Sequence, residues 1–164
     1  MNSKNIGNIG EAKVLTKFVE LGFPVYIPFG DNEKADLIVE FNGKLNKIQV
    51  KTSQKAEEGK MKFDLTSSTT HRKNGVKHIY TPEEIDYFAC YNIARDKIFL
   101  IKVDKALGTS ITIRYERPLN NQTSGIRFES DYLIENVLCV ETLHETPTEQ
   151  LFYGEEKVQT TIWK

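Results

Sequence analysis

Three residues whose side chains suit metal and phosphate chemistry, Asp36, Gln49 and Lys51, fall on two alternating stretches of sequence. We expect these stretches to be strands joined at Asn42-Gly43, because that dipeptide favours the positive φ angles of a tight hairpin turn. Side chains alternate between the faces of a strand, so Gln49 and Lys51 point the same way, and Asp36 opens the partner strand. A carboxylate, a carbonyl oxygen and an ammonium group at one end of a hairpin can hold a divalent cation beside a phosphate. The pattern predicts a metal-dependent nuclease.

The predicted site contains the groups that phosphodiester hydrolysis requires. Mg²⁺ is bound by one or two carboxylates, waters and substrate phosphate, and it activates water and neutralises charge. Asp36 is the natural anionic ligand, whereas Gln49 offers a neutral carbonyl oxygen and Val50 a second one from its main chain. Lys51 could orient or deprotonate the attacking water, or stabilise charge in the transition state. The sequence leaves these roles of Lys51 open.

A further carboxylate, Glu11, lies in the first expected helix, directly after Gly7-Asn8-Ile9-Gly10. The small residues of this segment allow the helix to pack closely against a sheet. A carboxylate early in a helix is also favourable through the helix dipole alone, so simple helix stabilisation is the alternative interpretation. If the helix crosses the hairpin, Glu11 reaches the metal directly or through water and restores the charge that Gln49 lacks.

These residues resemble the motifs of a known group of enzymes. Gly7-Asn8-Ile9-Gly10-Glu11, Ala35-Asp36 and Gln49-Val50-Lys51 are similar to the motifs of the PD-(D/E)xK nuclease superfamily, which includes restriction enzymes and Holliday-junction resolvases. The chain more closely resembles the branch of homing endonucleases encoded within bacterial group I introns. The similarity covers roughly residues 5–103 and includes Gly22-Phe23-Pro24-Val25, Pro28-Phe29-Gly30-Asp31 and Glu84-Ile85-Asp86-Tyr87-Phe88-Ala89.

The resemblance implies a fold and a site. The expected fold is α+β, a restriction-endonuclease-like core with a central mixed β-sheet flanked by helices. The resemblance assigns catalysis to Glu11, Asp36, Gln49 and Lys51. We expect Mg²⁺, with Mn²⁺ as a substitute, to be bound by Asp36, Gln49, Glu11 and the main-chain carbonyl of Val50. Two positions depart from the motif: Ala35 replaces a proline that does not bind metal, and Gln49 replaces the usual Asp or Glu. Glutamine occurs at this position in the branch that the chain resembles.

The charges of the chain are segregated although its net charge is only −1. Residues 44–80 hold nine Lys or Arg against three acids, whereas residues 129–164 hold eight acids against two lysines. A basic middle and an acidic end suit a protein that meets a polyanion on one face, although solvated surface charge is the alternative. We expect DNA contacts, which are largely phosphate contacts, from Lys55, Ser67, His71, Arg72, Lys73, Lys77 and Arg114.

A chain of 164 residues has the size of one domain. We expect the nuclease domain over residues 1–145 and a tail over residues 146–164 that docks on the body or on another subunit. No apolar run reaches the length of a membrane span, and no apolar signal segment opens the chain. Cys90 and Cys139 lie in apolar runs and are expected to be buried thiols, which favours a cytoplasmic location.

The pattern of apolar residues and turn signals predicts the following elements. Helices are expected over residues 6–21, ending at Gly22, and over 131–138, with a short helical turn over 81–84. A third strand over 60–66 is expected beside the hairpin, followed by a long loop over 67–78. The remaining strands are expected over 24–28, 36–41, 45–52, 87–92, 97–103 and 110–115.

The resulting expectation is a site-specific endonuclease that makes a double-strand break at a long pseudopalindromic target. One active site cuts one strand, so a homodimer or a dimer of dimers is expected. A Holliday-junction resolvase, or a repair or restriction nuclease of the same superfamily, is the alternative among enzymes. A catalytically inactive DNA-binding module is the alternative outside enzymes.

Overall fold

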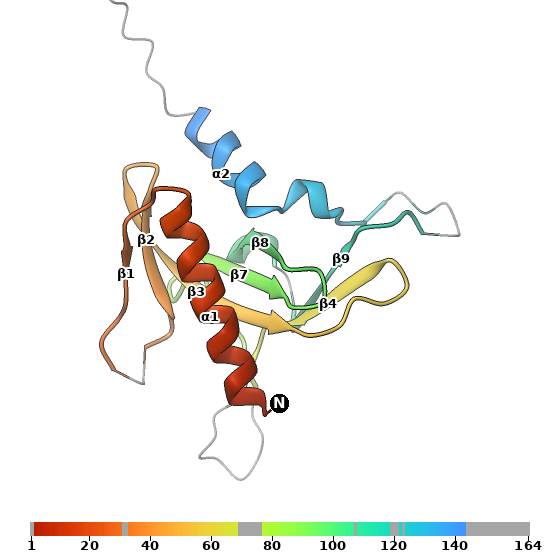
Figure 1. Cartoon of the computed structure of the whole chain (residues 1–164), viewed down its shortest axis with the longest axis horizontal. Coiled ribbons are helices and arrows are strands. Elements are labelled where there is room, and N and C mark those ends of the chain that lie inside the picture. The colour runs from red at the N-terminus through yellow and green to blue at the C-terminus, as the bar shows by residue number, and fades with distance from the viewer. Residues whose placement is uncertain are drawn as a thin grey trace, which may run out of the picture.

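A five-stranded mixed sheet forms the centre of the computed structural model, which describes residues 2–30, 33–68, 77–106, 108–118, 122 and 124–143 (Figure 1). The strand order is β1-β2-β3-β7-β8. β3 and β7 are parallel, and the other neighbours in the sheet are antiparallel. The strands are β1 (Val25–Tyr26), β2 (Leu37–Phe41), β3 (Lys44–Ser53), β7 (Tyr87–Asn92) and β8 (Lys97–Lys102). The predicted α+β class with a central mixed sheet is confirmed.

The β2–β3 hairpin has the turn that its sequence predicts. Asn42 and Gly43 have φ angles of 52° and 65°, the left-handed values that a two-residue hairpin turn requires. The pairing starts at Phe41↔Lys44 and ends at Leu37↔Ile48, and β3 continues past this last pair to Ser53. The longer strand therefore extends beyond its hairpin partner, at the position of Gln49-Val50-Lys51.

α1 (Ser3–Glu20) packs across one face of this sheet (Figure 1). It begins before the predicted boundary, because the Asn2 side chain caps it by accepting from the N–H of Asn5 over 2.9 Å. Its last residue is Glu20, one residue before the predicted end, and Gly22 follows the cap residue Leu21 with the left-handed φ of 84° that is typical after a helix. The fully buried Val14 and Phe18 anchor the helix on the sheet.

α2 (Ile134–Leu143) packs on the same face as α1 and follows the short helix η2 (Glu129–Asp131). Ile134 and Leu138 are buried in one apolar cluster with residues of α1 and of the sheet. The helix starts three residues later than predicted, because residues 129–131 form the separate turn of 3₁₀ helix.

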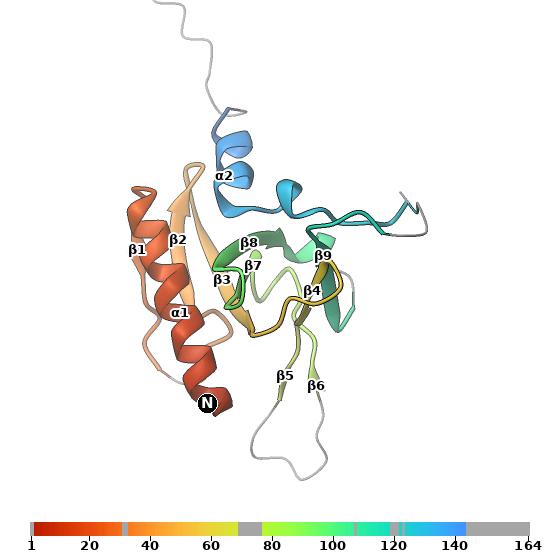
Figure 2. The ribbon, with the colours of Figure 1, turned by 45° about the vertical axis from the view of Figure 1, so that its right-hand side comes forward.

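A two-stranded ribbon covers the opposite face of the sheet (Figure 2). β4 (Lys60–Asp64) pairs with β9 (Ser110–Arg114), and the 3₁₀ turn η1 (Val103–Lys105) precedes β9. Met61, Phe63, Ile111 and Ile113 form the inner side of the ribbon and pack in one cluster with sheet residues. The prediction that residues 60–66 pair beside the hairpin is wrong, because β7 occupies that edge of β3.

The smaller expectations have different outcomes. Residues 67–78 contain the ends of a small hairpin, β5 (Ser67–Ser68) and β6 (Lys77–His78), and residues 81–84 form a hydrogen-bonded turn instead of a helix. Cys90 is buried as expected, but Cys139 is exposed. Within the part of the chain that the structure describes, no helix is long and apolar enough to cross a membrane. The predicted tail, residues 146–164, lies outside the described residues.

Candidate active site

Asp36 lies directly before β2 and is tied to β3 through both its main chain and its side chain. Its N–H donates to the carbonyl of Ile48 over 2.9 Å, which extends the hairpin by one hydrogen bond. Its Oδ2 then accepts from the N–H of Val50 over 2.7 Å and from Nε2 of Gln49 over 2.5 Å. The carboxylate thus continues the strand pairing where the backbone of β2 has turned away. The structure brings Asp36, Gln49 and Val50 together as predicted.

The surroundings of Asp36 oppose its ionisation. Burial is the largest cause and raises the pKa of its carboxyl group from 3.8 to about 6, and the negative charge of Glu11 adds to this effect. The hydrogen bond from Val50, the charge of Lys51 and the hydrogen bond from Gln49 act in the opposite direction. A nearby cation would stabilise the ionised form of such a half-buried carboxyl group, whose pKa is raised.

Two oxygen acceptors converge on the side-chain amide of Gln49. Gln49 is 8% exposed, and its Nε2 donates both to Asp36 Oδ2 and, over 3.3 Å, to the carbonyl of Val50. The carboxylate and the carbonyl therefore converge on one positively polarised group. These are the hard oxygen donors that Mg²⁺ prefers, and the amide of Gln49 carries a third oxygen. The donor set fits the metal that the motif implies.

Lys51 lies on the same face of β3 as Gln49 and is held by two contacts. Its Nζ donates to the carbonyl of Thr66 over 3.1 Å and lies 4.8 Å from the centre of the Tyr80 ring. Burial lowers the pKa of its ammonium group, while the negative charge of Asp36 opposes this shift. Lys51 therefore stands half-buried within electrostatic reach of the Asp36 carboxylate.

Glu11 projects from α1, and its charge acts on Asp36 from the helix side of the site. The approach of the helix depends on Gly10, because a Cβ at this position would lie 1.8 Å from Oγ1 of Thr52 in β3. The expected close packing of the glycine-containing segment against the sheet is thus observed. Among the described residues, no three His, Cys, Asp or Glu side chains gather to hold a metal.

Comparison with known proteins identifies the group to which this site belongs. The model of the PD-(D/E)XK endonuclease family matches residues 1–135. The chain belongs to this family. It is 41% identical over 54 residues to Protein 5.3 of Escherichia phage T7, a match that spans 32% of this chain and 46% of the phage protein.

A solved structure supports the fold of this PD-(D/E)XK protein. The bacterial homing endonuclease I-Ssp6803I matches it with a TM-score of 0.69 and 20% sequence identity. The match covers 90% of this chain and all of the other chain. The predicted restriction-endonuclease-like core is therefore confirmed at the level of the fold.

The predicted DNA-contacting residues of this PD-(D/E)XK chain divide into three groups. Ser67 and Lys77 lie in the small β5–β6 hairpin, next to Thr66 and so to Lys51, and Lys77 pairs with Asp64 over 3.2 Å. Arg114 lies at the end of β9. Lys55 lines a cavity of about 540 Å³ beside β4. The remaining three lie outside the described residues: His71, Arg72 and Lys73.

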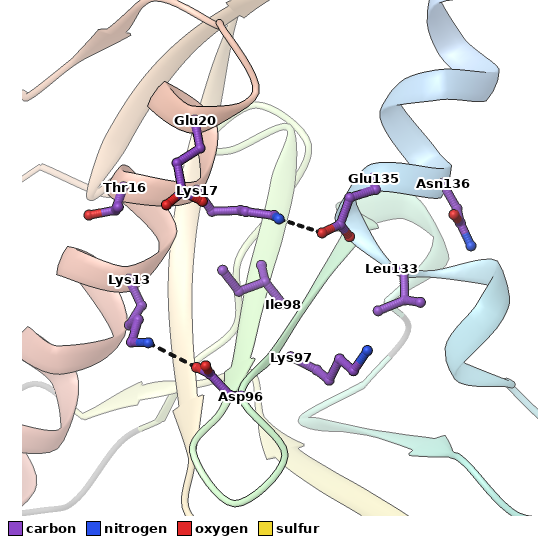
Figure 3. A pocket seen from close by; sticks show the side chains of 10 residues that line it. All are labelled: Lys13, Thr16, Lys17, Glu20, Asp96, Lys97, Ile98, Leu133, Glu135 and Asn136. Carbon is purple, nitrogen blue, oxygen red and sulfur yellow. Dashed lines mark hydrogen bonds and ion pairs between the residues drawn. The ribbon is translucent and has the colours of Figure 1, made fainter.

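A separate pocket of about 440 Å³ lies between α1, α2 and the β7–β8 turn, and contains none of the predicted site residues (Figure 3). Lys13 pairs with Asp96 over 3.0 Å, and Lys17 pairs with Glu135 over 2.6 Å. Both lysines come from α1 and both acids from neighbouring elements. These pairs connect the three elements, so we interpret the pocket as part of the scaffold.

Sequence reasoning missed Tyr80 and Thr66 as neighbours of Lys51. Tyr80 lies in a segment whose only predicted feature was the turn that follows it, and Thr66 acts through its main-chain carbonyl. A main-chain acceptor has no sequence signal. Both residues are near Lys51 only because the chain after β4 returns across the face of β3.

Proposed function

We propose that this protein is a site-specific, metal-dependent homing endonuclease that makes a double-strand break by hydrolysing phosphodiester bonds at a long pseudopalindromic DNA target. The observation that carries the proposal is the convergence of Asp36, Gln49, Val50 and Lys51 where β3 extends past β2. Membership of the PD-(D/E)XK endonuclease family supports the chemistry. The fold shared with a bacterial homing endonuclease supports the proposal that the nuclease is of the homing type.

Each residue has a role in the proposal that follows from its position. Asp36 and the carbonyl of Val50 would hold Mg²⁺, or Mn²⁺ in its place, together with Gln49 and Glu11. Such an ion, when bound, lowers the pKa of its water and neutralises charge on the phosphate. The carboxyl pKa of about 6 leaves Asp36 mostly ionised at neutral pH, as a metal ligand must be. Lys51 orients the attacking water or stabilises charge on the phosphate from its half-buried position.

The proposed partner is double-stranded DNA, bound by a homodimer or a dimer of dimers. Lys77 and Ser67 are next to the site, so they are suited to the phosphates that flank the scissile bond. Lys77 is exposed and pairs with Asp64 only at the surface, where such a pair is weak enough to exchange for a phosphate. Two sites related by a two-fold axis would cut the two strands of a pseudopalindrome.

The test is a cleavage assay in Mg²⁺ on duplex DNA that carries the intron-free insertion site of the gene, if the reading frame lies in an intron. Wild-type protein is expected to linearise this DNA at one position. Asp36→Ala and Lys51→Ala are expected to bind the DNA without cutting it. Lys102→Ala is a matched control, because this lysine also lies near a tyrosine ring, 5.7 Å from the centre of Tyr87, but at the end of β8.

Three outcomes distinguish the alternatives. Cleavage retained in both Asp36→Ala and Lys51→Ala would remove the active-site assignment. Sequence-independent cutting of four-way junctions in a parallel assay would favour a Holliday-junction resolvase. Metal-independent binding without cleavage of any substrate would leave a DNA-binding module on the same fold.

A further inference from the structure

Tyr80 is placed where it can control the position of Lys51. Its aromatic ring lies 4.8 Å from the Lys51 Nζ, and the charge of Asp36 acts on its phenol group. Tyr80 is half-buried, and no predicted site motif includes it. An ammonium group is attracted to the negative face of an aromatic ring at this distance.

The ring of Tyr80 is itself fixed from several sides. Phe88, which belongs to the core of the sheet, contacts it edge-on at 5.6 Å between ring centres, and His78 contacts it at 5.0 Å. Burial raises the pKa of the Tyr80 phenol group, and the nearby side chain of Ser67 opposes this shift. The ring therefore has little freedom to move away from Lys51.

The chain on both sides of Tyr80 is also held. Oε2 of Glu84 lies 2.9 Å from Nε2 of His78 and accepts from the N–H of Thr81 over 3.1 Å. One carboxylate thus connects the residues two positions before and one position after Tyr80. The backbone that carries the ring is fixed before any substrate arrives.

This arrangement addresses a weakness of lysine as a functional group. The side chain has many rotamers, and an unrestrained ammonium group must be ordered each time it acts. One N–H of Lys51 is taken by the carbonyl of Thr66, and the Tyr80 ring attracts the same ammonium group. An ammonium group has three N–H donors, so the anchored group keeps donor capacity for a phosphate oxygen or a water.

We propose that Tyr80 is a positioning residue whose ring holds the Lys51 ammonium group beside the Asp36 carboxylate for phosphodiester hydrolysis. The proposal rests on the proposed nuclease function. It assigns the role to the ring of Tyr80 and not to its hydroxyl group, so removal of the ring and removal of the hydroxyl have different consequences.

The kinetic test compares Tyr80→Leu with Tyr80→Phe on the cleaved DNA. Tyr80→Leu is expected to slow single-turnover cleavage about 100-fold, the loss typical of a misplaced catalytic group, with unchanged DNA affinity. Tyr80→Phe keeps the ring and is expected to retain the wild-type rate. Tyr87→Leu is the control for loss of a packed tyrosine, because Tyr87 is buried on the α1 face of the sheet and its ring contacts that of Phe41 at 5.5 Å between ring centres. It is expected to cut at the wild-type rate.

A second measurement does not depend on activity. The Tyr80 ring current is expected to shift the ¹H NMR signals of the Lys51 Hε protons in metal-free protein, because the Lys51 Nζ lies 4.8 Å from the ring centre. Lys51→Arg identifies these signals. Tyr80→Leu is expected to return the signals to ordinary lysine positions, whereas Tyr80→Phe and Tyr87→Leu leave them shifted. Far-UV circular dichroism of each variant confirms that it is folded.

Two results would overturn the proposal. One is a wild-type cleavage rate in folded Tyr80→Leu, or an equal loss in Tyr80→Phe, which would assign any effect to the hydroxyl. The other is a Lys51 signal that does not move in Tyr80→Leu. If wild-type protein cuts no DNA, the nuclease function itself fails, and the NMR comparison still decides whether Tyr80 holds Lys51.

Discussion

Val50 donates its main-chain N–H to Oδ2 of Asp36 over 2.7 Å. The Asp36 side chain thus acts as the hydrogen-bond acceptor for β3 directly before the first residue of β2. In an ordinary hairpin this donor would meet a backbone carbonyl of the partner strand. Here the Val50 N–H holds the Asp36 carboxylate in place instead. The side-chain amide of Gln49 donates both to this carboxylate and to the carbonyl of Val50. The site is thus formed by the difference in length between two paired strands.

Asp36→Asn is expected to stabilise the protein at neutral pH. The folded protein binds the Asp36 proton more tightly than the unfolded chain does, since burial raises the pKa from 3.8 to about 6. The stabilisation from protonation is complete below about pH 3.8 and is lost as the pH rises through about 6. The upper limit is about 3 kcal/mol at pH 7, from about 1.4 kcal/mol per pKa unit.

Denaturant unfolding of wild type and Asp36→Asn across this pH range measures the effect. The difference between their free energies of unfolding should grow from acid to neutral pH. A difference that stays constant with pH would contradict the assignment of Asp36 as a carboxyl group with a raised pKa.

Gly10→Ala is expected to destabilise the protein by about 1–3 kcal/mol, the usual cost of an overpacked contact. The new Cβ would lie 1.8 Å from Oγ1 of Thr52, so α1 must move away from β3. Gly7→Ala is the matched control in the same helix, because among the described residues no atom outside the adjoining helix backbone lies within 4 Å of its Cβ position. It should gain about 0.5–1 kcal/mol from helix propensity. Equal stability of the two variants, measured by thermal unfolding, would show that the helix does not depend on this contact.

Gln49→Glu is expected to lower the free energy of unfolding of the metal-free protein and to raise its affinity for divalent ions. The substitution replaces the Nε2 donor that lies 2.5 Å from Asp36 Oδ2 with a carboxylate oxygen, so two like charges meet in a buried site. An additional anionic ligand should raise Mg²⁺ affinity about tenfold in isothermal titration calorimetry. Gln54→Glu places the same charge at an exposed position and should change neither property. A Gln49→Glu protein with wild-type Mg²⁺ affinity would argue that this side chain is not a ligand.

The attachment of α2 is expected to depend on apolar packing more than on its ion pair. Ile134 is 0% exposed, and Ile134→Ala should cost about 2–5 kcal/mol. Glu135→Gln breaks the pair with Lys17, whose two side chains are 45% and 28% exposed, and should cost less than about 1 kcal/mol. Urea unfolding of both variants at two salt concentrations measures the two losses in free energy of unfolding. A larger loss in Glu135→Gln than in Ile134→Ala would contradict the prediction.

Much of the fold is determined by local properties of the sequence. Asn42-Gly43 sets the turn, and with it the register that places Asp36 next to Gln49-Val50-Lys51. The period of the apolar residues specifies α1 and the central strands, because each element must bury one face. Gly10 marks the position where the helix meets the sheet. These features depend on residues that are close together in the chain.

Other features depend on contacts between distant segments, and only the tertiary structure decides them. β3 pairs in parallel with β7 instead of with the β4 segment, a choice that depends on which long-range partner buries more apolar surface. The raised pKa of Asp36 results from burial, which no local pattern specifies. Tyr80 reaches Lys51 across the folded sheet. The sequence therefore predicts the chemical groups of the site, and the packing of distant segments determines their environment.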